Sequence, residues 1–207
     1  MISRRRFTAN TVLTALWSSL PSMAKAASTP ALANAPWRNW SGHLTANPLG
    51  RIAPNNEDEL VSALRRTNGA IRPVGSGHSF SPLVPTDGHL LVLDNLTGLV
   101  SHDADKMTAE LFAGTRLSDA GRLLNSIGQA MFNLPDIDRQ TLAGAISTAT
   151  HGTGRDLKSL SGYVQSLRLV TPSGDVLDLD AENDSDLFHA ARVSLGSLGI
   201  ITRVGFR

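Results

Sequence analysis

Cysteine is absent from the 207 residues of the chain. Its absence excludes disulfides, thiolate metal sites and cysteine nucleophiles, but it does not fix the compartment, because export permits disulfides without requiring them. Aromatic side chains make up only 5% of the chain, whereas glycine occurs 18 times. This composition predicts a loop-rich fold in which the backbone approaches something closely.

The body of the chain also lacks an excess of positive charge. Four of the 19 basic side chains lie in the first 26 residues, which contain no acid. The remaining residues carry 15 basic against 18 acidic side chains, a net charge of −3. A mildly acidic body has no electrostatic footprint for nucleic acid, so we expect no nucleic-acid partner.

Long apolar runs are missing as well. The uncharged stretch Thr8 to Met23 is too short to span a bilayer and is interrupted by Thr and Ser. It follows Ser3-Arg4-Arg5-Arg6-Phe7 and precedes Ala24-Lys25-Ala26, a site that suits a signal peptidase. This order predicts a twin-arginine-type signal peptide over residues 1–26 and a periplasmic or secreted protein. A basic, amphipathic membrane-surface helix is the alternative, and residues 27–39 are expected to form a spacer.

Helical and strand patterns alternate along the rest of the chain, which predicts an α+β fold. Asn55 and Asn56 precede three acids and a helical apolar pattern, as at a capped helix start. The other expected elements are strands at 71–74, 90–93, 110–113 and 200–206, helices at 117–127 and 187–192, and a hairpin of 164–171 with 176–179.

Three segments carry chemical interest. In Arg72-Pro73-Val74-Gly75-Ser76-Gly77-His78-Ser79-Phe80, two nearby glycines let successive N–H groups point into one concavity that suits an anion. Residues 141–154 have almost only small side chains and many hydroxyls, so a large planar or phosphorylated ligand can lie against the main chain. In residues 191–201, glycines between apolar residues allow close packing against another backbone or a ring. Taken singly, the three have plain alternatives: a tight turn, an internal Ser/Thr-rich strand, and core.

Taken together, the segments resemble the PCMH-type FAD-binding domain of the vanillyl-alcohol oxidase superfamily. Within it they are most similar to aldonolactone oxidases (D-arabinono-1,4-lactone and L-gulono-1,4-lactone oxidase type) and alditol oxidases. The resemblance rests on Gly-Ser-Gly-His-Ser-Phe at 75–80 and Ala-Gly-Ala-Ile-Ser-Thr-Ala-Thr-His-Gly-Thr-Gly at 143–154, with Asn39-Trp40-Ser41-Gly42 and Leu195-Gly196-Ser197-Leu198-Gly199-Ile200 in support. It implies a domain over residues 40–207, built of two α/β subdomains and truncated before a cap domain.

The resemblance also implies a cofactor and its site. FAD is expected to be bound covalently, through the 8α carbon of its isoalloxazine ring and His78. No catalytic residue is assigned, because the family keeps its proton-handling groups in the cap, and no metal site is expected. The residues expected to contact FAD are Pro73, Val74, Gly75, Ser76, Gly77, His78, Ser79, Thr141, Gly144, Ala145, Ile146, Ser147, Gly199 and Ile200.

The implied reaction is oxidation of an alcohol group in a sugar lactone or polyol. A hydride passes to flavin N5, and oxygen then takes the electrons and gives hydrogen peroxide. Asp136 stands where alditol oxidases have a serine near the substrate, which argues against polyols, although Asp136 beside Pro135 also fits plain turn chemistry. His151 is expected to be structural or close to the flavin. The alternatives are a non-catalytic FAD-binding remnant and a carbohydrate- or peptidoglycan-binding module.

Overall fold

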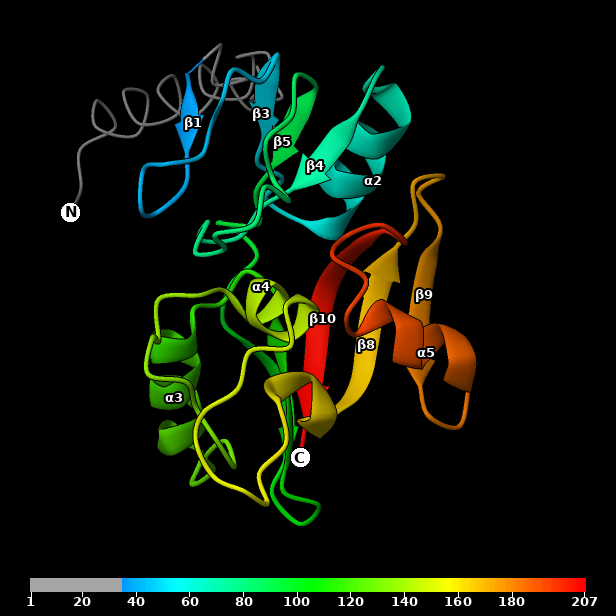
Figure 1. Ribbon diagram of the computed structural model, residues 1–207. Helices are drawn as coiled ribbons and strands as arrows, with labels where there is room; N and C mark the ends of the chain where they lie inside the picture. The colour runs from blue at the N-terminus through cyan, green and yellow to red at the C-terminus, as the bar shows by residue number, and fades with distance from the viewer. Residues whose placement is uncertain (1–34) are drawn as a thin grey trace, which may run out of the picture.

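The computed structural model describes residues 35–207 (Figure 1). The predicted signal peptide and most of the predicted spacer lie outside these residues. Helices and strands are mixed within the described part, which confirms the α+β class. None of the helices in this part is long and apolar enough to cross a membrane.

The strands are β1 (Trp37–Arg38), β2 (Thr45–Ala46), β3 (Gly50–Ile52), β4 (Ile71–Pro73), β5 (His89–Leu91), β6 (Leu99–Asp103), β7 (Thr108–Phe112), β8 (Val164–Val170), β9 (Val176–Asp180) and β10 (Ile200–Phe206). The helices are α2 (Glu57–Arg66), α3 (Leu117–Ser126), α4 (Leu142–Ser147), α5 (Ser185–Ala191) and the 3-10 helix η1 (Leu160–Tyr163).

The first sheet is small and parallel, in the order β3-β5-β4. Parallel strands need a crossover connection, and α2 supplies it between β3 and β4, the two strands that flank β5. The helix begins as the sequence predicts: the Asn56 side chain accepts a hydrogen bond from the Glu59 N–H at 2.8 Å. Leu60 on the inner face of α2 is fully buried.

The second sheet is antiparallel, in the order β6-β7-β10-β8-β9. The predicted hairpin is confirmed as β8 and β9, and β10 lies at the centre of the sheet between β7 and β8. Helices α3, α4 and α5 pack around this sheet (Figure 1). Their buried side chains form the largest core of the described residues, with Leu117, Leu124, Leu142, Ile146 and Phe188 from the helices.

A shared apolar cluster joins the two sheets. Leu60 of α2 and Leu91 of β5 pack with Val170 of β8 and Ile200 of β10. The two sheets are therefore held together by burial of apolar surface as well as by the chain connections. The division into two α/β subdomains remains a prediction.

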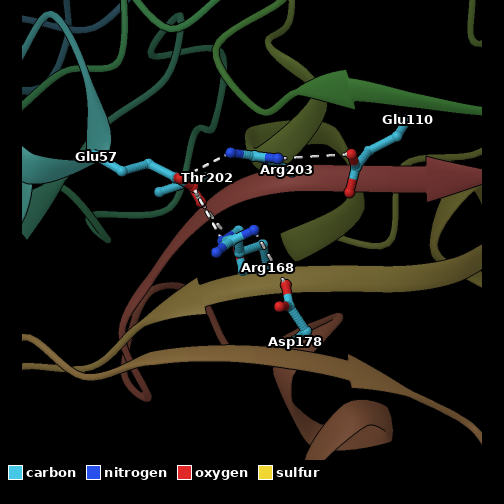
Figure 2. A network of polar contacts seen from close by, with 6 residues as sticks. All are labelled: Glu57, Glu110, Arg168, Asp178, Thr202 and Arg203. Atoms are coloured by element: carbon cyan, nitrogen blue, oxygen red, sulfur yellow. Dashed lines mark hydrogen bonds and ion pairs between the residues drawn. The ribbon is translucent and has the colours of Figure 1, made fainter. Parts of the chain in front are cut away.

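A polar network joins the same sheets beside that cluster (Figure 2). Glu57, the first residue of α2, accepts hydrogen bonds from Arg203 Nη2 at 2.8 Å and from the Thr202 hydroxyl at 2.5 Å, both on β10. Arg168 Nε of β8 lies 3.5 Å from the same carboxylate. Glu110 and Asp178 extend the network as second partners of Arg203 and Arg168. One carboxylate at the start of α2 thus contacts two strands of the other sheet.

The β1–β2 hairpin moves the expected start of the domain. Residues 27–39 were expected to be a spacer, but Trp37 and Asn39 are buried, with 7% and 4% of their surface exposed. Trp37 packs with Val74 and Leu90 in a third apolar cluster. Trp37 and Asn39 therefore belong to the packed fold, because the Trp37 side chain packs with Leu90 of β5, the central strand of the first sheet.

Candidate functional site

A cleft lies where the two sheets meet, and α4 is at this junction in Figure 1. Its empty volume is about 1010 Å³, a figure that includes space open to solvent. One side is formed by residues 73–79, which we call the loop wall. The other is formed by residues 141–148 and 195–201, which we call the core wall.

The loop wall follows β4 directly and presents main chain. The Val74 N–H donates to the Leu91 carbonyl at 2.9 Å, which ties the start of the loop to β5. In the part of the chain that the structure describes, the backbone N–H groups from Gly75 to Ser79 donate to no protein acceptor. Gly77 adopts φ +67°, a left-handed conformation that glycine adopts without strain. The loop wall therefore presents unpaired donors of the kind that bind an anionic group.

The core wall begins with α4, which the sequence pattern did not predict. Thr141 caps this short helix by accepting from the Gly144 N–H at 3.3 Å. The segment shows no periodic apolar pattern, because its residues are small and the apolar side chains of the helix span less than two turns. A Cβ added at Gly75 would overlap Oγ1 of Thr141, so the two walls touch at this point. Only a glycine leaves room there.

The rest of the core wall is the turn that leads into β10. At Gly199, φ is +147° and an added Cβ would lie 2.5 Å from the Val170 carbonyl oxygen. An added Cβ at Gly196 would overlap the ring of Pro73 on the loop wall. The sequence-based expectation that these glycines permit close packing against another backbone is thus confirmed at Gly199.

His78 lies in the loop wall, half-buried and in contact with an aromatic ring. Trp40 stacks on it, with ring centroids 5.3 Å apart and planes inclined by 24°. Burial lowers the pKa of His78 from its ordinary value of 6.5, and the nearby positive charge of Arg116 lowers it further. The imidazole is therefore neutral at neutral pH, the form in which a ring nitrogen can act as a nucleophile.

The structure brings most of the predicted cofactor-contact residues together. All of them line the cleft except Ala145 and Ile146, whose side chains are fully buried in the large core beneath α4. His151 is exposed and lies outside the lining residues, with its Nδ1 2.8 Å from the carbonyl oxygen of Gly152. Asp136 is exposed in a bend and is likewise not part of the lining, which fits the turn interpretation.

Residues outside the predicted set also line the cleft, among them Asp94, Gln140 and Gly114. Asp94 and Gln140 lie in loops without a motif, and Gly114 follows β7. An added Cβ at Gly114 would overlap the Leu93 carbonyl oxygen. A glycine directly after a predicted strand and before a predicted helix is a signal that could have identified this close approach.

An open cleft walled by glycines, hydroxyls and free backbone N–H groups fits a large, phosphate-bearing ligand laid along the main chain. The comparisons name that ligand. Residues 48–180 match the FAD binding domain family. The chain belongs to this family, and FAD is its cofactor.

Known relatives agree with the assignment. The chain is 37% identical over 171 residues to the L-gulono-1,4-lactone dehydrogenase of Mycobacterium tuberculosis, covering 81% of this chain and 39% of that protein. It is 36% identical over 178 residues to the D-arabinono-1,4-lactone oxidase of Eremothecium gossypii, covering 83% of this chain and 34% of the relative. A more distant match, 30% identical over 171 residues, is the L-gulonolactone oxidase of Scyliorhinus torazame, with 81% and 39% covered. The chain thus spans well under half the length of these relatives.

The residues of the cleft fit FAD. The unpaired N–H groups of the loop wall suit the diphosphate, and the missing Cβ atoms at Gly75 and Gly77 let the loop pack against Thr141 and Trp37. Apolar side chains such as Leu91, Ile200 and Ile201 line the same cleft and suit a flat ring system. No group of three or more potential metal ligands occurs among residues 35–207.

Proposed function

We propose that this chain is the FAD-bearing part of an oxidoreductase that oxidises an alcohol group of a sugar lactone, with oxygen as the electron acceptor. The observation that carries the proposal is the cleft between the loop wall and the core wall, which joins the motif with His78 to the motif with Thr141. The relatives named as lactone oxidases and dehydrogenases supply the substrate class. These relatives are named for lactones and not for polyols, so a lactone is the substrate class that we propose.

In this proposal the chain binds and orients the cofactor. The amides of residues 75–79 replace the water around the diphosphate, and the hydroxyls of Thr141 and Ser147 hydrogen-bond to the ligand from the core wall. Gly199 and Ile200 at the start of β10 would lie against the ring system. Bound FAD would supply the hydride acceptor for the alcohol and the route by which two electrons reach oxygen, with hydrogen peroxide as the product. We assign no catalytic base within residues 35–207.

The proposal includes a covalent bond between a ring nitrogen of His78 and the 8-methyl carbon of the flavin. One N–H and one C–H bond are replaced by an N–C bond, and the two electrons and two protons released reduce dioxygen to hydrogen peroxide. The neutral imidazole that follows from the lowered pKa favours this step. A covalent link also prevents cofactor loss after export, which suits the twin-arginine-type signal proposed for residues 1–26 and a periplasmic or secreted location.

An acid-precipitation experiment tests the link. The protein is purified, precipitated with acid and washed, and the flavin in the pellet is measured by its fluorescence on a denaturing gel. We expect yellow, fluorescent protein in the pellet of the wild type and of His151→Ala, a matched histidine outside the cleft. In His78→Ala we expect the flavin in the supernatant. Flavin that leaves the wild-type protein contradicts the histidyl link, and protein that never binds FAD contradicts the function.

The substrate and location have tests of their own. Under anaerobic conditions, the full-length natural protein should lose its oxidised flavin absorbance when L-gulono-1,4-lactone or D-arabinono-1,4-lactone is added, and regain it with oxygen. Protein that keeps its absorbance with every lactone and polyol tried is the non-catalytic remnant.

For export, replacing both Arg4 and Arg5 by lysine should retain the protein in the cytoplasm, as measured by cell fractionation.

A further inference from the structure

The segment Asn39-Trp40 holds the loop wall on both sides of His78. The Trp40 N–H donates to the carbonyl of Gly77 at 2.9 Å. The Asn39 side-chain amide donates to the carbonyl of Ser79 at 3.2 Å. The residues before and after His78 are therefore each fixed by one hydrogen bond from the same two neighbouring residues.

The imidazole itself is held by the indole ring of Trp40. The two rings stack with centroids 5.3 Å apart, and Phe80 meets the indole edge-on at 6.4 Å. Trp40 nevertheless keeps 63% of its surface exposed, so burial of the indole in the core does not account for the residue. Its ring instead stacks on the side chain that we propose to bond to the flavin.

Asn39 and Trp40 are themselves fixed to the fold. Asn39 is buried, and its Oδ1 accepts from the Leu44 N–H at 3.0 Å across the turn of the β1–β2 hairpin. The Trp37 ring lies 3.3 Å from where a Cβ at Gly77 would be, so the hairpin packs directly on the loop wall. The hairpin that carries Asn39 and Trp40 is thus packed on the loop that carries His78.

We propose that Asn39 and Trp40 form a clamp that positions the imidazole of His78 for bond formation with the 8-methyl group of FAD. The proposal rests on the covalent link proposed above and assigns a positioning role to residues outside the cofactor cleft. The hydrogen bonds fix the backbone around His78, and the indole fixes the plane of the imidazole. Bond formation requires the two atoms to be held in line and close, so loss of either constraint slows it.

The indole also shields one face of the imidazole from water. Burial is the main cause of the lowered pKa of His78. The charged group that acts on His78 is Arg116 at the start of α3; Asp94 lines the same cleft, and His43 lies in the hairpin turn beside Phe80. Removing the indole leaves Arg116 in place and exposes the ring, so the pKa of His78 rises toward 6.5.

The test compares the rate of covalent linking in the wild type, Trp40→Ala and Trp40→Phe. Each protein is prepared without cofactor, mixed with FAD and sampled over time for acid-stable flavin across a pH series. Total bound FAD is measured separately from the quenching of its fluorescence. Phe132→Ala is the matched control, since Phe132 is also exposed and stacked on a ring, that of Tyr163, outside the cleft.

We expect Trp40→Ala to bind FAD but to link it about 10-fold to 100-fold more slowly. The pH at which linking is half-maximal should rise in this variant, whereas a merely structural role would leave it unmoved. Trp40→Phe should recover most of the rate, and Phe132→Ala should match the wild type. A Trp40→Ala protein with the wild-type rate and pH midpoint overturns the clamp.

Two other outcomes are also decisive. If Trp40→Ala does not fold or bind FAD, Trp40→Phe is compared with Trp40→Leu, since both keep apolar bulk and only phenylalanine presents a ring face; equal linking rates overturn the clamp. A wild type that holds FAD without any acid-stable flavin overturns the link through His78 and the clamp with it. A linked wild type with an unaffected Trp40→Ala overturns the clamp alone.

Discussion

The two walls of the cleft are built in different ways. The loop wall stands on a three-stranded parallel sheet of very short strands, and it presents free amides and one imidazole. The core wall stands on a five-stranded sheet with the largest apolar cluster beneath it, and it presents small side chains over buried Ala145 and Ile146. The free amides and the imidazole thus lie on the loop wall, which has little apolar core behind it. The core wall is the one backed by the large apolar cluster.

This difference indicates what each wall contributes to the site. The loop wall must leave its polar groups unpaired, so it cannot be stabilised by its own hydrogen bonds and depends on the β1–β2 hairpin and on contact with the core wall. The core wall offers side-chain hydroxyls while the first backbone N–H groups of α4 are paired within the protein, so close packing can fix its backbone. Substitutions in the core wall should therefore affect stability, and substitutions in the loop wall should affect the cofactor.

The largest expected effect is that of Gly199→Ala in the core wall. The new Cβ would lie 2.5 Å from the Val170 carbonyl oxygen at φ +147°. Steric overlap and backbone strain together should cost about 3–5 kcal/mol of unfolding free energy. Thermal unfolding followed by circular dichroism measures this. Gly128→Ala is the control, because φ is +73° there with no atom within 4 Å of the new Cβ, and it should cost only about 1–2 kcal/mol. Equal losses of unfolding free energy in the two variants would show that the steric overlap at Gly199 adds nothing to the cost of a positive φ.

A smaller loss of stability is expected when the polar contact between the sheets is cut by Glu57→Gln. The carboxylate is 17% exposed and faces Arg203, Arg168 and the Thr202 hydroxyl (Figure 2). Its loss leaves two half-buried guanidinium groups without their shared partner, at a cost of about 2–3 kcal/mol in denaturant unfolding. Asp58→Asn, one residue along the same helix turn and exposed, should cost less than about 0.5 kcal/mol. If both variants unfold at the same denaturant concentration as the wild type, the sheets are joined by apolar packing alone.

The smallest effect on stability, but a clear one on FAD, is expected for Gly75→Ala in the loop wall. The added methyl group overlaps Oγ1 of Thr141 and forces the walls apart where they touch. In a His78→Ala background, where FAD exchanges freely, its dissociation constant should rise about 10-fold to 100-fold. Adding Thr141→Ala removes the overlapping oxygen and should restore part of the affinity; the recovery is incomplete because the same change removes a hydroxyl that we propose to bind FAD. Loss of the α4 cap also costs about 1 kcal/mol of stability. A double variant that binds no better than Gly75→Ala would contradict contact between these two residues.

Local patterns predicted much of the fold. The cap at Asn56 and the acids after it satisfy the first turn of α2 without any distant contact, so that helix start was predictable. Alternation and the turn at 171–175 likewise predicted the β8–β9 hairpin, and an apolar run predicted β10. β3, β6 and α4 were not predicted, because their residues are too few or too small to produce a periodic apolar pattern.

The candidate site was predictable only as separate segments. Glycine spacing and the small residues at 141–154 indicated a ligand-binding backbone, and family resemblance named FAD. That Ala145 and Ile146 face the core, that His151 lies outside the cleft and that Trp37 belongs to the fold were not apparent from the sequence. Each of these facts depends on which face of a turn or short helix a residue occupies. Elements of only a few residues are too short to show a periodic apolar pattern from which that face could be predicted.

The amino-acid order by itself determined the capped start of α2, the β8–β9 hairpin, the existence of strand β10 and the residue types that a dinucleotide needs, since these follow from interactions between near neighbours. Only the tertiary structure decided that Gly75 meets Thr141, that Glu57 meets Arg203 and that Trp40 stacks on His78. These contacts join residues up to 146 positions apart. They exist because buried apolar surface draws the two sheets together, and that burial is a property of the whole chain.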